Sequence, residues 1–405
     1  MRLSFPATDH RARFPEASAE EFRDWRWQQR HVISDAQDLG RRFPLAPEER
    51  LGIARTKGLF KLGITPYYAA LMDEQHLWCP VRRQAIPLPN EATVRPEELA
   101  DPLGEDHNRP VPAIVHKYPD RVLFLALDRC SVYCRHCTRR RLTGQETTDL
   151  DRHTMEEGLG YVRAHPEVRD VLVSGGDPFL LSTERLQALL TGLRAIPHVE
   201  LIRLGTRVPV CNPFRVDDAL AKVLREAEAF VVTHFNHPKE LTLEAKEACE
   251  RLVDHGVPVE NQTVLLRRIN SSARIIRDLN HRLLRIRVRP YYLHQGDVAQ
   301  GLDHLRTPLA KGIEILEQLR GHTSGLAVPH LAVDLPDGGG KVTLQPTYLV
   351  SQSESSARFR NYKGETYDYP EPIERDCSVP YDDLFYAADE PAPTPRRPLA
   401  IVRCS

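Results

Sequence analysis

Short apolar runs recur along the middle of the chain and alternate with stretches of helical periodicity. The runs lie at residues 122–127, 171–173, 201–204, 230–232, 257–259 with 264–266, 286–288 and 331–333. The helical stretches lie at residues 182–193, 216–226, 241–254 and 309–319. Strands that alternate with helices of about 10–15 residues predict βαβ units and a parallel sheet. The spacing of roughly 30 residues per unit predicts an α/β fold, a partial (β/α)6-type barrel.

The two ends of the chain lack this alternation. Residues 1–110 predict an N-terminal helical region, with helices at residues 19–32 and 47–59. The barrel itself is expected over residues 111–345. Residues 346–405 are expected to form a C-terminal extension, whose proline-rich end is typical of an extended, flexible arm.

Unusual polar residues follow the predicted strands at the points where the strands end. Cys130 follows the first strand, the Gly-Gly-Asp of residues 175–177 follows the second, and residues 206–207 follow the third. The His-Phe-Asn-His of residues 234–237 follows the fourth. In parallel α/β barrels the active site lies at the carboxyl ends of the strands. We therefore expect these residues to share one site.

The overall charge and hydropathy exclude some functional classes. With 55 basic and 56 acidic residues the formal net charge is -1, so no general field attracts nucleic acid. No stretch approaches the ~20 apolar residues that span a bilayer, and the charged N-terminus has no apolar segment behind it. We expect a cytoplasmic protein that binds neither nucleic acid nor membrane.

Three of the eight cysteines lie close together, at Cys130, Cys134 and Cys137. Disulfide frameworks belong to small secreted chains, so this grouping in a chain of cytosolic type indicates a metal site. Three thiolates can hold three irons of a [4Fe–4S] cluster and leave the fourth iron open to a small chelating molecule. The alternative is zinc with His136 as fourth ligand, which its position between two cysteines disfavours. A non-enzymatic electron carrier is a further alternative, but such proteins usually supply all four ligands.

A glycine-rich turn ends in a lysine at Gly338-Gly339-Gly340-Lys341. Backbone N–H groups of such a turn can hold a phosphate, and a lysine can carry pyridoxal phosphate covalently. The turn lacks the spacing of a nucleotide-binding P-loop. On these residues alone, a surface hairpin with a solvated lysine is the favoured interpretation.

Five longer motifs carry a resemblance to a known family. They are Tyr-Pro-Asp-Arg-Val-Leu-Phe at 118–124, Cys-Arg-His-Cys-Thr-Arg-Arg-Arg at 134–141, His-Phe-Asn-His-Pro at 234–238, Arg-Val-Arg-Pro-Tyr-Tyr at 287–292 and Gly-His-Thr-Ser-Gly at 321–325. With these motifs the chain resembles the lysine 2,3-aminomutase family of the radical S-adenosylmethionine superfamily, from about Ser18 to Pro370. Cys-x3-Cys-x2-Cys after a first barrel strand is the signature of that superfamily.

The resemblance implies three cofactors and the residues that hold them. Cys130, Cys134 and Cys137 would bind the [4Fe–4S] cluster, and Lys341 would carry pyridoxal phosphate. Further pyridoxal phosphate contacts are expected from Gly338, Gly339, Gly340 and Arg121, although Asp337 stands where the family usually has a glycine. The expected S-adenosylmethionine contacts are Gly175, Gly176, Asp177, His136, His234, Asn236 and Gln262, with Asp177 in place of the glutamate usual in the superfamily.

The resemblance also implies a reaction and a substrate. S-adenosylmethionine would be cleaved to a 5′-deoxyadenosyl radical that removes a hydrogen atom from the β carbon, and the α-amino group would move there. Arg139 is expected to bind the substrate α-carboxylate, because a guanidinium grips a carboxylate with two hydrogen bonds. Asp297 and Asp334 are expected to bind the ε-ammonium of L-lysine, since two close carboxylates repel unless a cation lies between them. Alternatives are arginine or another amino acid, or a lysine within a protein.

The expected partners follow from the same resemblance. They are an amino-acid substrate, an electron donor such as flavodoxin or ferredoxin, and further copies of the chain in a homo-oligomer. Some family members carry a structural zinc site near the C-terminus, but here only Cys377 and Cys404 lie in that region. Residues 271–272 are serines in the region where a further ligand would be expected. We therefore expect no zinc.

Overall fold

The computed structural model describes residues 4–144 and 150–375. It divides into two compact units, Met1–Pro346 and Thr347–Ser405. The first unit contains the large sheet with its helices and the N-terminal helices, and the second contains a small separate sheet. Every candidate site residue named from the sequence, from Arg121 to Lys341, lies in the first unit.

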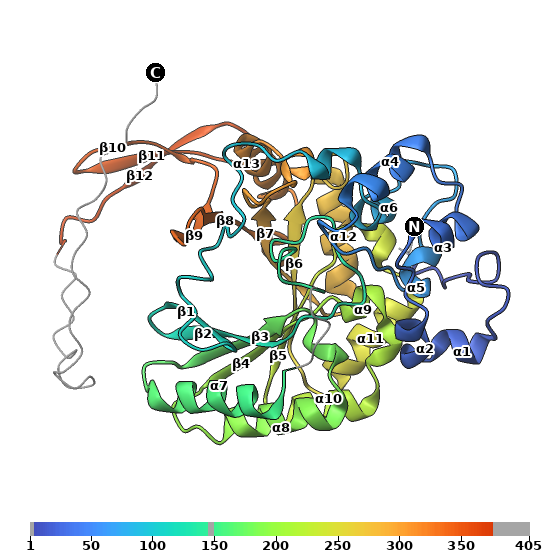
Figure 1. Cartoon of the computed structure of the whole chain (residues 1–405). Helices are drawn as coiled ribbons and strands as arrows, with labels where there is room; N and C mark the ends of the chain where they lie inside the picture. Colours follow the sequence, from blue (N-terminus) through green and yellow to red (C-terminus); the bar gives the residue numbers. More distant parts are fainter. Residues whose placement is uncertain (1–3, 145–149, 376–405) are drawn as a thin grey trace. The chain divides into compact units, whose positions relative to one another are not determined.

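A nine-stranded sheet forms the centre of the first unit, with its strands in sequence order (Figure 1). The strands are β1 (Ile114–Tyr118), β2 (Arg121–Leu127), β3 (Asp170–Gly175), β4 (Leu201–Gly205), β5 (Phe230–Thr233), β6 (Val259–Leu265), β7 (Arg289–Gln295), β8 (His330–Leu335) and β9 (Gly340–Leu344). Strands β2 to β8 are parallel, whereas β1 and β9 add antiparallel edges. Within the described residues β1 and β9 do not pair with each other, so the barrel is open.

Helices connect each parallel strand to the next. They are α7 (Arg152–Ala164), α8 (Thr183–Arg194), α9 (Val208–Cys211), α10 (Asp218–Glu226), α11 (Leu243–Asp254), α12 (Ala273–Arg285) and α13 (Leu309–Leu319), with 3-10 turns η2 (Pro178–Leu180), η3 (Pro213–Arg215), η4 (Pro238–Glu240), η5 (Asp303–Leu305) and η6 (Gly325–Ala327). No helix in the described ranges combines the length and the apolar composition needed to cross a membrane. The six helical crossovers confirm the predicted α/β partial barrel of (β/α)6 type, and β8 adds a seventh parallel strand.

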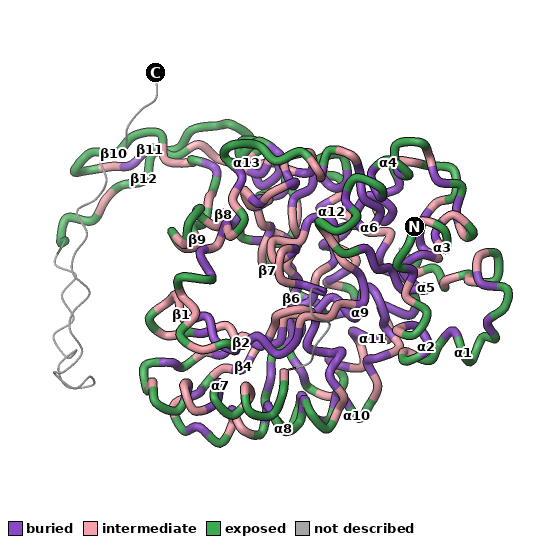
Figure 2. The backbone as a smooth tube through the Cα atoms, viewed as in Figure 1, coloured by how far each residue is buried: buried purple, intermediate pink, exposed green. Residues whose placement is uncertain are grey.

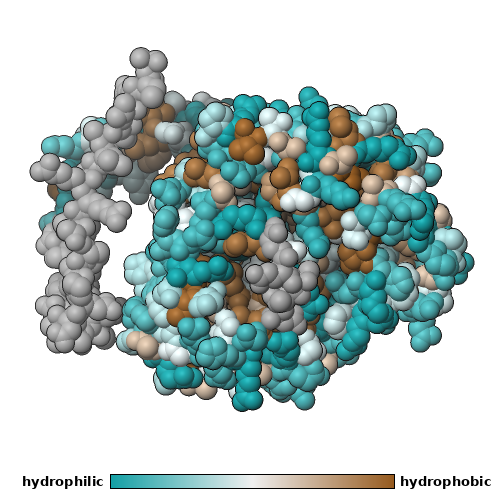
Figure 3. Space-filling view, in the orientation of Figure 1, coloured by the Kyte–Doolittle hydropathy of each residue, from teal (hydrophilic) through white to brown (hydrophobic). Residues whose placement is uncertain are grey.

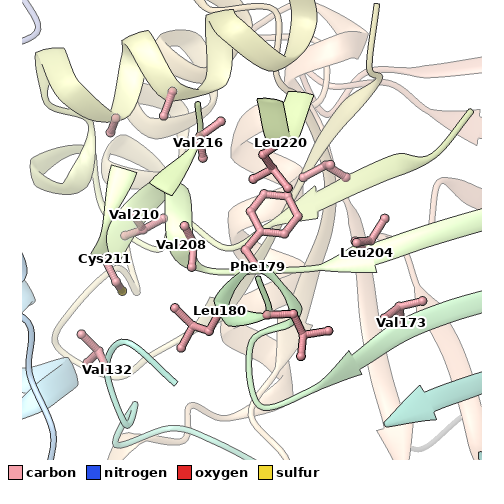
Figure 4. Packing of buried hydrophobic residues seen from close by; sticks show 14 of the residues in the cluster. Val132, Val173, Phe179, Leu180, Leu204, Val208, Val210, Cys211, Val216 and Leu220 are labelled. Carbon is pink, nitrogen blue, oxygen red and sulfur yellow. The ribbon is translucent and has the colours of Figure 1, made fainter. Parts of the chain in front are cut away.

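The core lies between the sheet and these helices because both are amphipathic. The leucines of α8 recur at helical spacing and are all buried; they are Leu186, Leu189, Leu190 and Leu193. Phe179, shortly before α8, points into the same apolar cluster beside Leu204 and Leu220 (Figure 4). The helices turn polar sides outward, as the exposed segments of Figure 2 and the hydrophilic face in Figure 3 show. Burial of this layer contributes stability at about 25 cal/mol per Å² of apolar surface.

Short helices make up the N-terminal region. They are α1 (Ala19–Arg23), α2 (Trp25–Arg30), α3 (Ala36–Arg42), α4 (Pro47–Thr56), α5 (Pro66–Ala70), α6 (Pro80–Ala85) and the 3-10 turn η1 (Pro89–Ala92). Buried polar contacts attach them to one another and to the barrel. Glu49 of α4 and Arg82 of α6 form a fully buried ion pair. The Tyr67 hydroxyl of α5 lies 2.5 Å from the Thr242 hydroxyl at the start of α11.

The structure differs from the sequence prediction at several boundaries. The predicted helix at 19–32 is two helices, because Asp24 ends α1 and its carboxylate then accepts a 2.7 Å hydrogen bond from the Arg26 N–H of α2. The strand expected from the paired apolar runs at 257–259 and 264–266 is β6, which begins only at Val259 and ends at Leu265, and its residues alternate in burial. The predicted strand at 286–288 was wrong, since Arg287 has a φ of 58° in the turn after α12 and β7 begins at Arg289.

The second unit contains an antiparallel sheet that the sequence did not predict. Its strands are β10 (Leu349–Gln352), β11 (Ser356–Arg360) and β12 (Thr366–Pro370). Strands of four or five residues that are mostly exposed leave no apolar run to recognise. Cys377, Cys404 and the proline-rich arm lie outside the described residues.

Replacing Arg82 by methionine should lower thermal stability more than loss of a surface ion pair does. Arg82 donates 2.6 Å hydrogen bonds from Nε and Nη2 to the Glu49 carboxylate, and both side chains are fully buried. The variant leaves the Glu49 charge unpaired, which costs about 3–5 kcal/mol. The measurement is the midpoint of thermal unfolding.

The matched control is Arg23→Ala, which removes an exposed ion pair with Glu247. Exposed pairs of this kind contribute about 0–1 kcal/mol. Equal shifts of the midpoint in Arg82→Met and Arg23→Ala would contradict the assignment of Arg82 as a buried structural charge.

Candidate functional site

The loop after β2 brings the three clustered cysteines around one pocket. Cys130, Cys134 and Cys137 line it together with Phe60 and Tyr133. Burial raises the pKa of the Cys130 and Cys137 thiols. In the described part of the chain no three ligating side chains converge on a single ion, but each thiolate of an iron–sulfur cluster binds its own iron.

A fourth cysteine, Cys211 in α9, lies near this loop but outside the pocket. It is 1% exposed and packs with Val132 and Val210 in the apolar cluster (Figure 4). Burial raises the pKa of the Cys211 thiol. The neighbouring Cys134 accepts a 2.6 Å hydrogen bond from Nη1 of Arg207. Only the three cysteines of the β2 loop therefore share the pocket lining among the described residues.

Buried charges hold the cysteine loop in place. Glu91 is fully buried and accepts hydrogen bonds from Arg135 and from Arg140, which flank Cys137. The guanidinium of Arg140 also lies 3.6 Å from the centre of the Phe60 ring. Burial alone would raise the pKa of Glu91, but the two arginines lower it to about 2. No local pattern in the sequence indicates this role of Glu91, because it lies 44 residues before Arg135.

Two glycines allow the loop after β3 to pack against the cysteine loop. A Cβ on Gly175 would lie 2.4 Å from the Leu127 carbonyl oxygen, and Gly175 has a φ of 114°. A Cβ on Gly176 would lie 2.2 Å from the Arg129 carbonyl oxygen. Real Cβ atoms do not come this close, so both positions require glycine. Their backbone is therefore held directly beside Cys130.

The Asp177 carboxylate joins the loops after β3 and β4. It accepts a 2.6 Å hydrogen bond from the Thr206 hydroxyl, a 2.7 Å bond from the Arg207 amide and a 3.2 Å bond from the Phe179 amide. Burial raises the pKa of Asp177, and these hydrogen bonds oppose the rise. Both of its oxygens thus already have protein donors.

Three of the predicted S-adenosylmethionine contacts meet near the cysteine loop. The Asn236 amide nitrogen lies 3.2 Å from Nε2 of His136, and the rings of His136 and His234 are 5.3 Å apart. Within the described residues, His136 Nδ1 and His234 Nε2 are buried without a hydrogen-bond partner. Burial, and then the charge of Arg207, lower the pKa of both rings, so they are neutral. These neutral ring nitrogens can bind a polar ligand.

Lys341 is the second residue of β9 and pairs with Asp334 of β8. Its Nζ is 2.5 Å from the Asp334 carboxylate and 3.4 Å from Nδ1 of His294. Its backbone N–H donates a 3.0 Å hydrogen bond to the Tyr118 hydroxyl. The preceding turn is left-handed at Asp337, with a φ of 53°. That conformation explains why glycine is usual there, although aspartate tolerates it better than most residues.

The ring of Tyr118 lies between Arg121 and Lys341. Arg121 forms an ion pair with Asp120, 3.0 Å between Nε and Oδ1, and its guanidinium lies 5.0 Å from the centre of the Tyr118 ring. The glycine-rich turn is attached to the loop before β1 by the Asp337 amide, which donates a 3.0 Å hydrogen bond to the Pro102 carbonyl. The structure thus places Arg121 beside Tyr118 rather than in contact with Lys341.

Arg139 is paired with a carboxylate that the sequence analysis missed. Glu105 accepts hydrogen bonds of 2.8 and 3.0 Å from Nε of Arg139 and lies 2.7 Å from its Nη2. In the described part of the chain Nη1 of Arg139 donates to no protein group. A guanidinium has two edges that can each bind a carboxylate. Glu105 occupies the Nε–Nη2 edge and leaves the Nη1–Nη2 edge accessible.

Asp297 follows β7 and reaches the cysteine loop. It accepts a 2.5 Å hydrogen bond from the Thr138 hydroxyl, and Thr138 directly follows Cys137. Burial raises the pKa of Asp297, with a further rise from the charge of Asp334. Burial alone would also raise the pKa of Asp334, but His294 and Lys341 lower it to about 2. The two carboxylates are close enough for the charge of Asp334 to act on Asp297.

His294 connects the two halves of the candidate site. Its Nε2 lies 3.3 Å from the Gln262 side-chain oxygen, on β6, and its Nδ1 faces Lys341 on β9. The sequence analysis did not single out His294, although it shares a side of β7 with Tyr292, two residues earlier. Residues from the ends of β2, β3, β5, β6, β7 and β8 are thereby gathered at one end of the barrel, as expected for parallel strands.

Comparisons with known proteins agree with this arrangement. A family model described as Lysine-2,3-aminomutase matches residues 316–391. An L-lysine 2,3-aminomutase from Fusobacterium nucleatum is 47% identical over 91% of this chain and 87% of that protein, and one from Bacillus subtilis is 48% identical over 87% and 75%. A glutamate 2,3-aminomutase from Clostridioides difficile is 40% identical over 85% and 82%. The chain therefore belongs to the lysine 2,3-aminomutase family of radical S-adenosylmethionine isomerases.

Proposed function

We propose that the chain is an L-lysine 2,3-aminomutase, which moves the α-amino group of lysine to the β carbon. The observation that supports lysine as the substrate is the 2.5 Å ion pair between the Asp334 carboxylate and Nζ of Lys341. Asp334 therefore already binds a primary ammonium on a four-carbon stem, the same group that a lysine substrate brings. When Lys341 is bonded to a cofactor, Asp334 would be free to bind the ε-ammonium of the substrate.

Asp297 supports the same substrate from the other side. Its hydrogen bond to Thr138 leaves the carboxylate without a cationic partner among the described residues. Two carboxylates would repel an acidic side chain such as glutamate by several kcal/mol in a desolvated pocket. A guanidinium would satisfy both carboxylates as well, so arginine is the competitor that an experiment must include.

Arg139 is proposed to bind the α-carboxylate of the substrate. Its Nη1–Nη2 edge is accessible, and two parallel hydrogen bonds from it would fix the carboxylate in orientation as well as in position. The bidentate contact with Glu105 holds the guanidinium in a fixed plane for that purpose. The substrate would thus extend from Arg139 at its α end to Asp297 and Asp334 at its ε end.

The residues present fit the three proposed cofactors. When bound, a reduced [4Fe–4S] cluster with S-adenosylmethionine supplies a carbon radical that can take a hydrogen atom from an unactivated carbon, and pyridoxal phosphate carries the migrating nitrogen. Cys130, Cys134 and Cys137 share one pocket and would hold three irons. The buried, unpartnered ring nitrogens of His136 and His234 fit a polar ligand beside that pocket.

The remaining parts of the proposed cofactor sites are backbone and amine groups. Gly175 and Gly176 present backbone without a side chain next to the cysteine loop, which suits close contact with S-adenosylmethionine. The Lys341 amine and the N–H groups of the glycine-rich turn suit pyridoxal phosphate and its phosphate group. Reduction of the cluster needs an electron from outside, for which we propose a small donor such as flavodoxin or ferredoxin.

Replacing Cys130, Cys134 or Cys137 by alanine should each abolish the iron–sulfur cluster, because two thiolates cannot hold the cubane. Iron and sulfide content and the visible spectrum of anaerobically purified protein measure this. Cys211→Ala and Cys249→Ala are the controls and should keep the cluster, since both side chains are buried in apolar surroundings. Loss of the cluster in Cys211→Ala would instead indicate four protein ligands and no open iron.

Borohydride reduction of the enzyme loaded with pyridoxal phosphate should label Lys341. The reason is its position at the end of the glycine-rich turn with its amine inside the site rather than in solvent. Peptide mapping by mass spectrometry reads the labelled residue, and Lys341→Arg should remove the label. Labelling at the exposed Lys311 in the unaltered enzyme would refute the assignment.

The enzyme should convert lysine to β-lysine but leave glutamate unchanged. Anaerobic turnover of lysine, arginine and glutamate with dithionite, S-adenosylmethionine and pyridoxal phosphate, read by chromatography, measures this. Asp297→Ala and Asp334→Ala should each weaken lysine turnover by roughly tenfold to a hundredfold in kcat/KM, because a hydrogen-bonded charge contributes about 1.5–3 kcal/mol. Asp106→Ala, which alters an exposed carboxylate paired with Arg141, is the matched control.

Each other outcome of that experiment has a definite meaning. Turnover of glutamate would defeat the proposed substrate, as would lysine turnover undiminished in both aspartate variants. Turnover of arginine alone would keep the roles of Asp297 and Asp334 and replace lysine as the substrate.

A further inference from the structure

His294 lies at the centre of the candidate site without a role in the proposed chemistry so far. Its Nδ1 is 3.4 Å from Nζ of Lys341 and 3.6 Å from the Asp334 carboxylate. Its Nε2 is 3.3 Å from the side-chain oxygen of Gln262. The ring therefore touches the amine that would bond the cofactor and is held from behind by an amide.

The partners of His294 determine which of its nitrogens carries the proton. The Gln262 oxygen can only accept, so it binds an N–H at Nε2. The Lys341 ammonium can only donate, so it faces a lone pair at Nδ1. Both contacts agree on one neutral tautomer, with its proton on Nε2 and its basic nitrogen directed at Lys341.

We propose that His294 accepts the proton of the Lys341 ammonium and so releases the free amine that bonds pyridoxal phosphate. The inference rests on the proposed function, in which Lys341 carries that cofactor. The ammonium form has no lone pair and cannot act as a nucleophile. In the step, one proton moves from Nζ to Nδ1, giving a neutral amine and an imidazolium. The amine then forms a carbon–nitrogen bond to the cofactor aldehyde, with release of one water.

Asp334 makes this proton transfer possible without creating an unpaired charge. Its carboxylate lies 2.5 Å from Nζ of Lys341 and 3.6 Å from Nδ1 of His294, so it faces the positive charge before and after the transfer. The count of charges in the pocket stays the same, and only the carrier of the positive charge changes. An isolated Lys341–Asp334 pair would instead keep the lysine in its charged, unreactive form.

Other titratable groups face His294 and enter any pH dependence. Lys341 faces it from β9 and Asp334 from β8. Tyr292, on its own strand, has its ring 5.2 Å away. His234, after β5, and Asp297, after β7, lie close enough for a charge on His294 to act on them. Gln262 on β6 is the neutral neighbour that fixes the tautomer.

The test is the rate at which Lys341 captures pyridoxal phosphate, which requires no turnover. Cofactor-depleted enzyme that keeps its cluster is mixed with pyridoxal phosphate, quenched with borohydride at intervals and mapped by mass spectrometry. The variant is His294→Asn, whose amide oxygen can occupy the place of Nδ1 and accept the same hydrogen bond but cannot take a proton. Measurements span about pH 6 to 9, from the ordinary range of histidine toward that of lysine.

We expect His294→Asn to capture the cofactor on the order of a hundredfold more slowly near neutral pH, as for loss of a positioned general base. The difference should shrink as pH rises, because bulk base then deprotonates Lys341. Gln262→Leu removes the contact that fixes the tautomer but keeps the imidazole. Its capture rate should lie between those of His294→Asn and the unaltered enzyme. His153→Asn, at an exposed position in α7, is the matched control and should behave as the unaltered enzyme.

Equal capture rates in His294→Asn and the unaltered enzyme at every pH would overturn the inference and leave the proposed function intact. A slower rate that stays parallel at all pH values would make His294 a positioning group only and would also overturn it. If the unaltered enzyme shows no label on Lys341, the proposed function itself fails. Should His294→Asn not fold, Gln262→Leu with a capture rate and pH profile identical to the unaltered enzyme would decide against the proposal.

Discussion

The buried carboxylate of Glu91 holds together the loop on which the whole site is built. It binds Arg135 and Arg140, the two arginines that flank Cys137, in a region without solvent. Its pKa, which the two arginines lower to about 2 against the effect of burial, keeps it charged near neutral pH. A buried charge of this kind is stable only with its partners, and loss of one partner costs about 3–5 kcal/mol. The position of the cysteines therefore depends on a residue that touches no ligand.

Between that loop and the glycine-rich turn lies a series of carboxylates, each paired with its own donor. Glu105 orients Arg139, Thr138 donates to Asp297, and Asp334 pairs with Lys341. The first contact joins the loop before β1 to the loop after β2, the second joins the loop after β2 to the loop after β7, and the third joins β8 to β9. The proposed substrate would bring its carboxylate to Arg139 and its ammonium to Asp297 and Asp334. Each buried charge would then have a partner of opposite sign.

Strong local patterns made much of the fold predictable. The parallel strands and their helices follow from repeated apolar periodicity, and the cysteine motif follows from spacing. Lys341 was indicated only by the family resemblance, because its glycine-rich turn alone favours a surface hairpin. The pairs that complete the site do not follow from periodicity or spacing, because Glu105 lies 34 residues from Arg139 and Lys341 lies 47 residues from His294. Local sequence patterns do not predict which charged residues pair across such separations. The same limit applies to β10–β12, whose exposed residues carry no apolar pattern.

The open barrel has a consequence for motion. Lys341 belongs to β9, an edge strand bonded to β8 along one side only. Across the opening, two hydrogen bonds among the described residues tie the strand and its turn to the loop and strand on the far side, from the Lys341 amide to Tyr118 and from the Asp337 amide to Pro102. Edge strands with few ties open locally at lower free energy than central strands. The lysine that must change partners thus lies on the element of the sheet best able to shift, while the cysteine loop is fixed by buried charge.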